Sequence, residues 1–414
     1  MRRFGWLSLL VALLSVEAHA QVGANIPVEF GSSPNPVGSG ARALGIGSAF
    51  IATADDATAA SWNPGALIVL ENPEASIVYS FKNRREAFAG IGVSEADEIQ
   101  QVSYGALNYL SAAYPFKIGS RYFVASLNFQ SLIDFDKDQQ KTYFTSVAAS
   151  PGVPSLRAET DVRFRQRGSL QAISPAIAFQ LAPNLSVGVT LNISTSKLGF
   201  GNGWQQLESY QRRAQLGSNP LEDSFELRER NNFDGFGANL GVLWDITPRW
   251  TLGAVVKTPV AGTLSREIRR FERNGESLID VPLELEDSYR LPPSYGVGVA
   301  YRFSDELTVS GDLYQTLWGL FRQEKTDPLS GESVAINPIN ARPYDSADVD
   351  RITQVHLGAE YLFIFPRTVV PIRGGLFYDP EPGDGVTSHF FGVALGTGIS
   401  IWNDWVIDVA YQAR

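Results

Sequence analysis

The strongest constraint on the fold is a period-two alternation that recurs from residue 73 to the end of the chain. In residues 185–194, every second residue is Leu, Val or Ile, and the residues between them are Ser, Gly, Thr or Asn. Successive side chains of a strand point to opposite faces, so such a run predicts a strand with one apolar and one small or polar face. Counting similar runs, which include 236–245, 295–303 and 405–412, gives roughly thirteen strands of about ten residues, a length that crosses a bilayer when tilted.

A soluble β-sandwich would show the same alternation, so the lengths of the connections are needed to separate the two folds. Short connections near 115–120, 182–184, 245–249, 304–306, 366–367 and 403–404 alternate with long ones at about 83–101, 134–160, 199–230, 263–283, 323–347 and, more tightly, 379–387. Outer-membrane barrels have short periplasmic turns and long outer loops. The alternation of lengths therefore favours a barrel.

Aromatic residues gather beside the short connections. They are Tyr114, Phe116, Tyr122, Phe123, Trp244, Trp250, Tyr301, Phe303, Phe363, Phe365, Trp402 and Trp405. Amphipathic rings settle at the boundary between lipid and water, whereas the core of a sandwich would not collect them at one end of its strands. We therefore predict an all-β fold, an antiparallel transmembrane β-barrel over residues 73–414.

The N-terminus has the three parts of a secretory signal peptide. Arg2 and Arg3 precede an apolar stretch at 6–16, and Ala18-His-Ala20 forms a cleavage site. We predict a signal peptide at 1–20, a mature chain beginning near Gln21, and location in the outer membrane of a Gram-negative cell. No later segment has the length and apolarity of a transmembrane helix.

Composition excludes several classes of site. The chain has no cysteine, which removes thiol catalysis, disulfides and cysteine-based metal sites. Of the three histidines, His19 lies in the signal peptide, and only His356 and His389 remain. The net charge of −10 argues against a nucleic-acid partner. We expect no catalytic residues, no metal and no cofactor.

Residues 21–72 separate the signal peptide from the strands and have a different composition. Gly, Ala and Ser dominate 38–61, with too few large apolar side chains to form a core of their own. A segment of this kind can be packed inside a larger structure, so we predict that 21–72 plugs the lumen of the barrel. Its candidate contact residues are Phe50, Trp62, Asn63, Pro64 and Gly65.

The number of strands raises a question about barrel closure. With a periplasmic N-terminus, the strand at 405–412 runs outward, whereas closed single-chain barrels have an even number of strands. We expect that the full protein has about fourteen strands and that the last is missing here, or that the barrel closes in another way.

The segment 38–67 resembles a known family. Its pattern Gly-x-x-Ala-x-Gly-x-Gly-x-Ala-Phe, followed by Ala-Asp-Asp-Ala-Thr and Trp-Asn-Pro-x-x-Leu, is similar to the N-terminal hatch of the FadL/TodX outer-membrane transporters for fatty acids and other hydrophobic compounds. Further similarity lies at 291–301, at Trp318 and at 371–380. The family barrel has fourteen strands. The family's Asn-Pro-Ala hatch motif falls on Asn63, Pro64 and Gly65, so the third position departs from the pattern.

The resemblance implies passive uptake of a hydrophobic compound, a fatty acid or an aromatic hydrocarbon, by a monomer surrounded by outer-membrane lipid and lipopolysaccharide. Outer loops would capture the compound, an apolar lumen above the hatch would take it up, and a gap in the third strand would release it sideways. The strand at 122–133 has no Gly or Pro to kink it, whereas Pro175 and Pro292-Pro293 must interrupt a strand ladder. Candidate capture residues in the 199–230 connection are Phe200, Trp204, Leu207 and Tyr210, and a loop that only shields itself is the alternative.

Two other functions are compatible with a barrel. A structural or secretion-accessory barrel would have a lumen filled with polar side chains. A barrel hydrolase would use Ser388 and His389, with His389 hydrogen-bonded to an acid or an amide.

Overall fold

The computed structural model describes residues 38–414 except 89–97, 152–153, 198–201, 275–276, 327–330, 386 and 403–404. The predicted signal peptide, residues 21–37 and the candidate residue Phe200 lie outside the described residues.

One antiparallel ladder forms the wall of the barrel. Its strands, in order of pairing, are β1 (Glu74–Phe88), β2 (Glu98–Ile118), β3 (Arg121–Asp134), β5 (Leu156–Ala182), β6 (Leu185–Ser194), β8 (Asn219–Asp245), β9 (Trp250–Lys257), β12 (Ser294–Arg302), β13 (Leu307–Thr316), β17 (Ile352–Phe365), β18 (Thr368–Tyr378), β19 (Phe391–Ile401) and β20 (Trp405–Ala413). The predicted all-β barrel is confirmed, and the tight connections near 182–184, 245–249, 304–306 and 366–367 lie where the sequence placed them. The connection predicted at 115–120 is shorter, since β2 continues to Ile118, and the one predicted at 403–404 lies outside the described residues.

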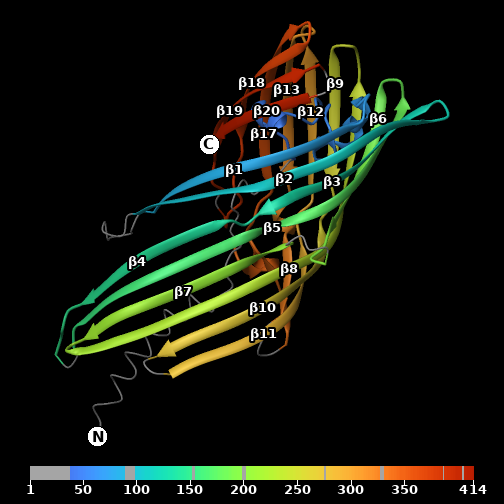
Figure 1. The fold of residues 1–414 in the computed structure, drawn as a ribbon. Coiled ribbons are helices and arrows are strands. Elements are labelled where there is room, and N and C mark those ends of the chain that lie inside the picture. The colour runs from blue at the N-terminus through green and yellow to red at the C-terminus, as the bar shows by residue number, and fades with distance from the viewer. Residues whose placement is uncertain are drawn as a thin grey trace.

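The predicted long loops are wrong over much of their length, because they are strands that extend the sheet beyond the barrel. β4 (Lys137–Val147) pairs with β5, β7 (Gly203–Leu216) lies between β5 and β8, and β10 (Ala261–Asn274) joins β8 to β11 (Ser277–Arg290). Figure 1 shows these strands running together away from the barrel. Polar residues such as Gln205 and Gln215 occupy the outward face of β7, so the sequence of β7 lacks the alternation of apolar and polar residues that marks the barrel strands.

Short elements complete this end of the molecule. β14 (Arg322–Thr326) pairs with β11 and with β15 (Ser333–Asn337), which pairs with β16 (Arg342–Pro343). Two 3-10 turns, η3 (Trp318–Leu320) and η4 (Tyr344–Ser346), flank them.

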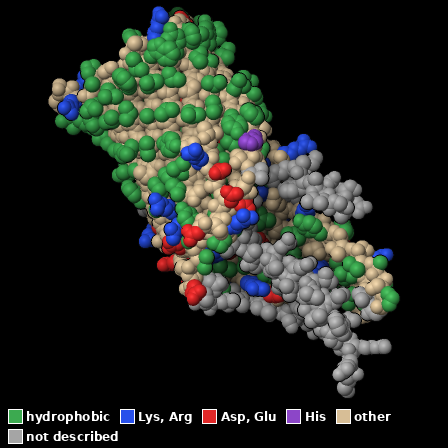
Figure 2. Space-filling model, turned by 180° about the vertical axis from the view of Figure 1, so that it is seen from behind, with side chains coloured by type: hydrophobic (Ala, Val, Ile, Leu, Met, Phe, Trp, Pro, Cys, Tyr) green, Lys and Arg blue, Asp and Glu red, His purple; other side chains and the backbone are tan. Residues whose placement is uncertain are grey.

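The outer face of the barrel strands is apolar. Outward side chains such as Ile77, Phe391 and Tyr411 are 73%, 75% and 70% exposed. Figure 2 shows hydrophobic side chains covering the barrel in successive rows, with charged side chains gathered mainly beyond this band. A continuous apolar surface of this extent is far larger than a water-soluble monomer exposes and matches the lipid-facing band of a transmembrane barrel.

Aromatic rings line the end of the barrel with the short turns, as the sequence predicted. Trp250 packs against Tyr301 at 4.6 Å between ring centroids, and Tyr301 in turn packs against Phe303. Trp402 and Trp405 are 66% and 72% exposed beside the last turn. These rings are placed to lie at a membrane interface.

The N-terminal segment, residues 38–72, lies within the curve of the wall. It contains α2 (Ala41–Gly45), α3 (Ala59–Trp62) and η1 (Pro64–Val69). The helix α2 contacts β18, β19 and β20, whereas η1 contacts β3, β5, β6 and β8. Between these, Ile51 lies against Gly253 of β9 and Gly298 of β12. Only a segment that the sheet surrounds can touch strands from both ends of one ladder. Among the described residues, no helix combines the length and apolarity required to cross a membrane.

The two outermost strands of the ladder, β1 and β20, are joined to this segment. Within the described residues no ladder connects β1 to β20. Gln412 of β20 donates a hydrogen bond to the Leu44 carbonyl at 3.0 Å, and Glu74 of β1 accepts one from the Ala57 amide at 2.9 Å. A fourteenth strand stays a prediction.

The ladder has irregularities at two predicted places and at three others, two of which are register shifts between Val78 and Tyr79 in the β1–β2 pairing and between Gln180 and Ala182 in the β5–β6 pairing. The β5–β6 pairing passes from Ile173 to Ala176 without a partner pair at Pro175, and residues 291–293 separate β11 from β12, as the prolines predicted. The β3–β5 register also shifts between Ser131 and Ile133, without any Gly or Pro in that part of β3.

Candidate functional site

The candidate site extends along the barrel axis, from the N-terminal segment to the sheet beyond the barrel. Its first part is the contact made by Asn63, which is completely buried. The Asn63 side-chain amide donates hydrogen bonds to the carbonyls of Ile51 and Val242, both at 2.9 Å, and its oxygen accepts one from the Gly65 amide at 3.1 Å. One side chain thus caps η1 and joins the segment to β8.

Glycines allow the segment to touch the wall at this point. A Cβ atom at Gly65 would lie 2.8 Å from the carbonyl oxygen of Gly241, and one at Gly188 would lie 2.3 Å from the carbonyl oxygen of Pro64. Real Cβ atoms do not approach backbone this closely. The departure from the family's Asn-Pro-Ala motif at Gly65 therefore has a physical reason, since alanine would force this contact apart.

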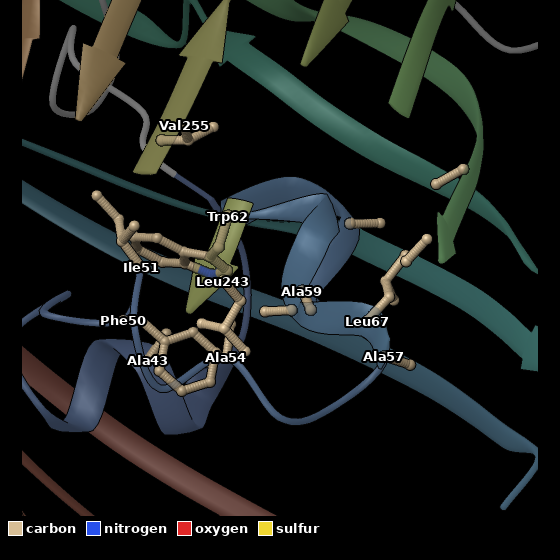
Figure 3. Packing of buried hydrophobic residues seen from close by; sticks show 14 of the residues in the cluster. Ala43, Phe50, Ile51, Ala54, Ala57, Ala59, Trp62, Leu67, Leu243 and Val255 are labelled. Atoms are coloured by element: carbon tan, nitrogen blue, oxygen red, sulfur yellow. The ribbon is translucent and has the colours of Figure 1, made fainter. Parts of the chain in front are cut away.

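Phe50 and Trp62 form the core of the segment. Their rings meet edge to face at 5.7 Å, and the Trp62 indole donates a hydrogen bond to the Ser39 carbonyl at 2.6 Å. Figure 3 shows small alanines around these rings, with Leu243 and Val255 of the wall among the packed residues. Small side chains let the segment fit closely inside the barrel, in agreement with its composition.

A network of ion pairs holds the opposite side of the segment. Arg42 of α2 binds both carboxylate oxygens of Glu360, at 3.1 and 2.8 Å, and also pairs with Asp55. Arg373, whose side chain is 4% exposed, pairs with Glu360 and with Asp408 at 2.5 Å each. The network joins the segment to β17, β18 and β20.

A cavity of about 730 Å³ lies at the end of the barrel with the short turns. The N-terminal segment contributes Arg42, Ile46 and Asp55 to its lining, and the turn at 245–249 contributes a second side. Charged and polar side chains make up much of the lining of this cavity.

A belt of hydrogen-bonded polar side chains runs along the inner face of five neighbouring strands, next to the segment. It consists of Tyr109, Asn128, Gln130, Ser174, Asn192 and Asn239 from β2, β3, β5, β6 and β8. Asn192, for example, accepts from Gln130 at 2.6 Å and donates to Asn239 at 3.1 Å. These residues occupy the small or polar face of their strands, which identifies that face as the inner one.

An apolar and largely aromatic cluster lies beyond the polar belt. We call it the outer cluster, and it comprises Ile133, Phe135, Leu170, Trp204, Phe233, Val260, Leu264, Tyr289, Leu291, Trp318, Phe321, Val349 and Ile352. Trp204 lies among the rings of this cluster, 4.5 Å from the Phe135 centroid and 5.9 Å from that of Tyr289. A cluster of this kind offers a hydrophobic compound apolar contacts and ring stacking.

The candidate capture residues have different positions. Trp204 belongs to the outer cluster, and Tyr210 lies further from the barrel, stacked on Phe225 at 5.8 Å. Leu207 is on the opposite face of β7 from both. Most rings of the cluster, including Phe135, Phe233 and Phe321, were not identified from the sequence. They come from segments far apart in the chain, and no local pattern connects them.

Charged groups border the outer cluster on the sheet beyond the barrel. Arg266 pairs with Asp287 at 2.7 Å, and Gln323 donates a hydrogen bond to Asp287 at 2.6 Å. Burial raises the pKa of the Glu208 carboxyl to about 7, although a hydrogen bond from Gln206 opposes the shift. Burial likewise lowers the pKa of Lys325. Charges of both signs therefore lie close together here.

Among the described residues, His389 does not make the hydrogen bond predicted for a hydrolase. The hydrogen-bond partner of His389 is the Tyr378 hydroxyl, at 2.6 Å, and not an acid or an amide. In the described part of the chain, no three His, Cys, Asp or Glu side chains are grouped to hold a metal ion.

Comparisons with known proteins agree with this architecture. Residues 36–412 match the family described as outer membrane protein transport protein (OMPP1/FadL/TodX). A Pseudomonas aeruginosa FadL homologue is 15% identical with a TM-score of 0.57, covering 91% of this chain and 90% of that one. The monoaromatic hydrocarbon channel CymD is 15% identical with a TM-score of 0.54, covering 91% and 93%. The Pseudomonas putida toluene transporter TodX is 14% identical with a TM-score of 0.53, covering 94% and 93%. No curated protein sequence matches the chain.

The solved structures, at this low identity, show that the fold is shared. The family match shows in addition that the sequences are related, because it covers the chain from the start of the N-terminal segment to the last strand. The chain therefore belongs to the FadL/TodX family of outer-membrane transport proteins.

Proposed function

We propose that this protein carries hydrophobic compounds, long-chain fatty acids or aromatic hydrocarbons, passively across the outer membrane. The observation that carries the proposal is the outer cluster, which is aromatic and lies in line with the N-terminal segment. A hydrophobic compound crosses the lipopolysaccharide layer poorly and gains little in a water-filled pore, so it needs a path with apolar contacts. The outer cluster supplies such contacts between the extended sheet and the lumen.

In this proposal, residues 21–72 act as the hatch. Its described part, residues 38–72, lies inside the wall and lines the cavity at the short turns. A compound released from the outer cluster meets the polar belt next, where an apolar molecule gains less than in the cluster. The cluster is accordingly proposed as the capture site, and Asn63, Gly65 and the Arg42 network as the attachments that hold the hatch in the wall.

Uptake by whole cells tests the transport proposal. The chain is expressed in a Gram-negative host without channels of this family, and the accumulation of radiolabelled toluene and radiolabelled oleate is measured. We expect at least one of the two to accumulate faster than in cells with an empty vector. The proposal would be disproved if the protein is folded and located in the outer membrane, yet both compounds accumulate no faster than in cells with the empty vector.

Substitution of Trp204 is expected to reduce this uptake. A buried ring contact contributes about 1.4 kcal/mol beyond its area, so Trp204→Ala should lower the initial rate about tenfold at low substrate concentration. The control is Trp250→Ala, which removes a ring that is 45% exposed on the outside of the barrel. The control should keep the wild-type rate, and resistance of both variants to unfolding by heat in SDS shows that each has folded.

We also propose that the first twenty residues are removed on export and that the protein is a monomer in outer-membrane lipid and lipopolysaccharide. Native mass spectrometry of protein extracted from outer membranes tests both statements at once. The expected species is a single chain that begins at Gln21. A mass that includes residues 1–20, or a stable oligomer, would contradict the corresponding part.

A further inference from the structure

Three buried polar side chains surround Trp204 without a hydrogen-bond partner. The side-chain amides of Gln166 and Asn231 and the hydroxyl of Tyr289 make no hydrogen bond with any group in the part of the chain that the structure describes. Their residues are 0%, 2% and 0% exposed. Buried polar groups are nearly always paired in folded proteins, so three unpaired groups around one ring call for an explanation.

Strand register places the three groups together. Trp204 of β7 pairs with Asn231 of β8, so the two side chains lie side by side on the same face. On the other side, Trp204 pairs with Gly168 of β5, and Gln166 is the next residue on that face. The Tyr289 ring lies 5.9 Å from the Trp204 ring. Amide, amide and hydroxyl therefore lie around one indole, at the polar edge of the outer cluster.

The same strand shows that such groups can be paired. Asn239 lies on the inner face of β8, eight residues from Asn231, and is 3% exposed. It accepts a hydrogen bond from Asn192 at 3.1 Å within the polar belt. The fold therefore satisfies a buried asparagine where the role is structural, and Asn231 differs from it in having no partner.

The charges near Trp204 determine what kind of group would fit. Arg266, the neighbour of Asn231 on β10, is already paired with Asp287 and lies 3.9 Å from Glu229. Glu208 and Lys325 add one more carboxyl and one more ammonium group. Three acidic and two basic side chains lie here, so a carboxylate ligand would meet an excess of acidic groups, whereas a neutral donor or acceptor would meet an uncharged amide or hydroxyl.

We propose that the surroundings of Trp204 recognise a neutral hydrogen-bonding group, such as a hydroxyl or a carbonyl, on an otherwise aromatic or apolar ligand. The ring of the ligand would contact the outer cluster, and its polar group would bond with Asn231, Gln166 or Tyr289. This inference rests on the proposed transport function and narrows it, because it gives preference to aromatic alcohols and ketones over hydrocarbons and over carboxylates.

Binding of three matched compounds to the full-length protein tests the inference. Radiolabelled toluene, benzyl alcohol and benzoate share one ring and differ in the group attached to it. Flow dialysis of the purified protein in detergent, corrected with detergent alone, gives the affinity for each. We expect wild-type protein to bind benzyl alcohol most tightly and benzoate most weakly. Loss of one hydrogen bond in Asn231→Leu should weaken benzyl alcohol binding about tenfold and leave toluene within about twofold.

The matched control is Asn239→Leu, which removes a paired asparagine from the same face of the same strand. It should lower the temperature of unfolding, because the buried side-chain NH2 of Asn192 loses its acceptor, and leave the ratio of the benzyl alcohol and toluene affinities unchanged. Asn231→Leu should not lower the temperature of unfolding, because it removes a group without a partner. Gln166→Leu is a second test variant, for which we expect the same weaker binding of benzyl alcohol and the same unchanged temperature of unfolding as for Asn231→Leu.

Four outcomes separate this inference from the proposed function. If toluene binds and Asn231→Leu binds benzyl alcohol as tightly as wild type does, the unpaired groups serve no ligand and the inference is wrong, while the transport proposal stands. Tightest binding of benzoate by wild-type protein would overturn it equally. If none of the three compounds binds to the protein but oleate uptake occurs, this inference is again wrong. If nothing hydrophobic binds or is taken up, the transport proposal itself is wrong and the inference falls with it.

Discussion

Gly241→Val is expected to displace the N-terminal segment and to open the lumen to ions. A Cβ at this position would lie 2.1 Å from the side-chain oxygen of Asn63 and 2.7 Å from the Pro64 ring. Overpacking of this kind costs about 1–3 kcal/mol, and the lost hydrogen bonds of Asn63 add about 1 kcal/mol each. Together these effects should raise the population with a displaced segment by roughly two to three powers of ten.

Ion conductance across a planar lipid bilayer measures this displacement directly. Wild-type protein should pass little current, and Gly241→Val should show frequent open events. The control is Gly374→Val, a glycine-to-valine change on the outward face of β18, where an added Cβ has no atom within 4 Å. If both variants conduct equally little, the contact at Gly241 does not hold the segment in place, and the proposed hatch loses its main support.

Arg373→Met is expected to cause the largest loss of stability in the wall of the barrel. The Arg373 side chain is 4% exposed and neutralises Glu360 and Asp408. Removing one partner of a buried ion pair leaves a charge without compensation and typically costs about 3–5 kcal/mol. Arg42 still pairs with Glu360, so we expect about 3 kcal/mol, measured as the free energy of unfolding in denaturant from lipid vesicles.

The matched control for this prediction is Arg342→Met. Arg342 also pairs with an aspartate, Asp384, but the two side chains are 55% and 33% exposed. Exposed pairs contribute about 0.2–1 kcal/mol, so the control should lie close to wild type. A loss of similar size in both variants would show that the burial of Arg373 does not strengthen its ion pairs.

The barrel itself could be predicted from the sequence because its information is local. Period-two alternation is read within ten residues, and the short turns and their aromatic neighbours lie next to one another in the chain. The predicted turn at 245–249 and the rings of Trp244 and Trp250 are where the sequence placed them. The composition of residues 38–61 likewise predicted a segment packed inside something larger, and its described part is surrounded by strands.

The predictions were least accurate beyond the barrel. The segment at 203–216 looked like a loop, because its outward residues are polar and it lacks an apolar face, yet it is the strand β7. Backbone pairing with β5 and β8 makes it a strand, and pairing depends on neighbours that are distant in the sequence. The same error occurred at β4, β10 and β11.

By itself, the sequence determined that this chain forms a membrane barrel. Alternation predicts strands with one apolar face, and the lengths of the connections and the aromatic residues beside the short ones separate a barrel from a soluble sandwich. The composition of the N-terminal segment predicts that it packs inside a larger structure. The tertiary structure alone decided which residues meet inside the wall. Arg42 reaches Glu360, 318 residues away, and Trp204 lies beside Tyr289 and Asn231, because closure of the sheet brings distant strands together. Contacts of that range leave no trace in a local pattern of residues.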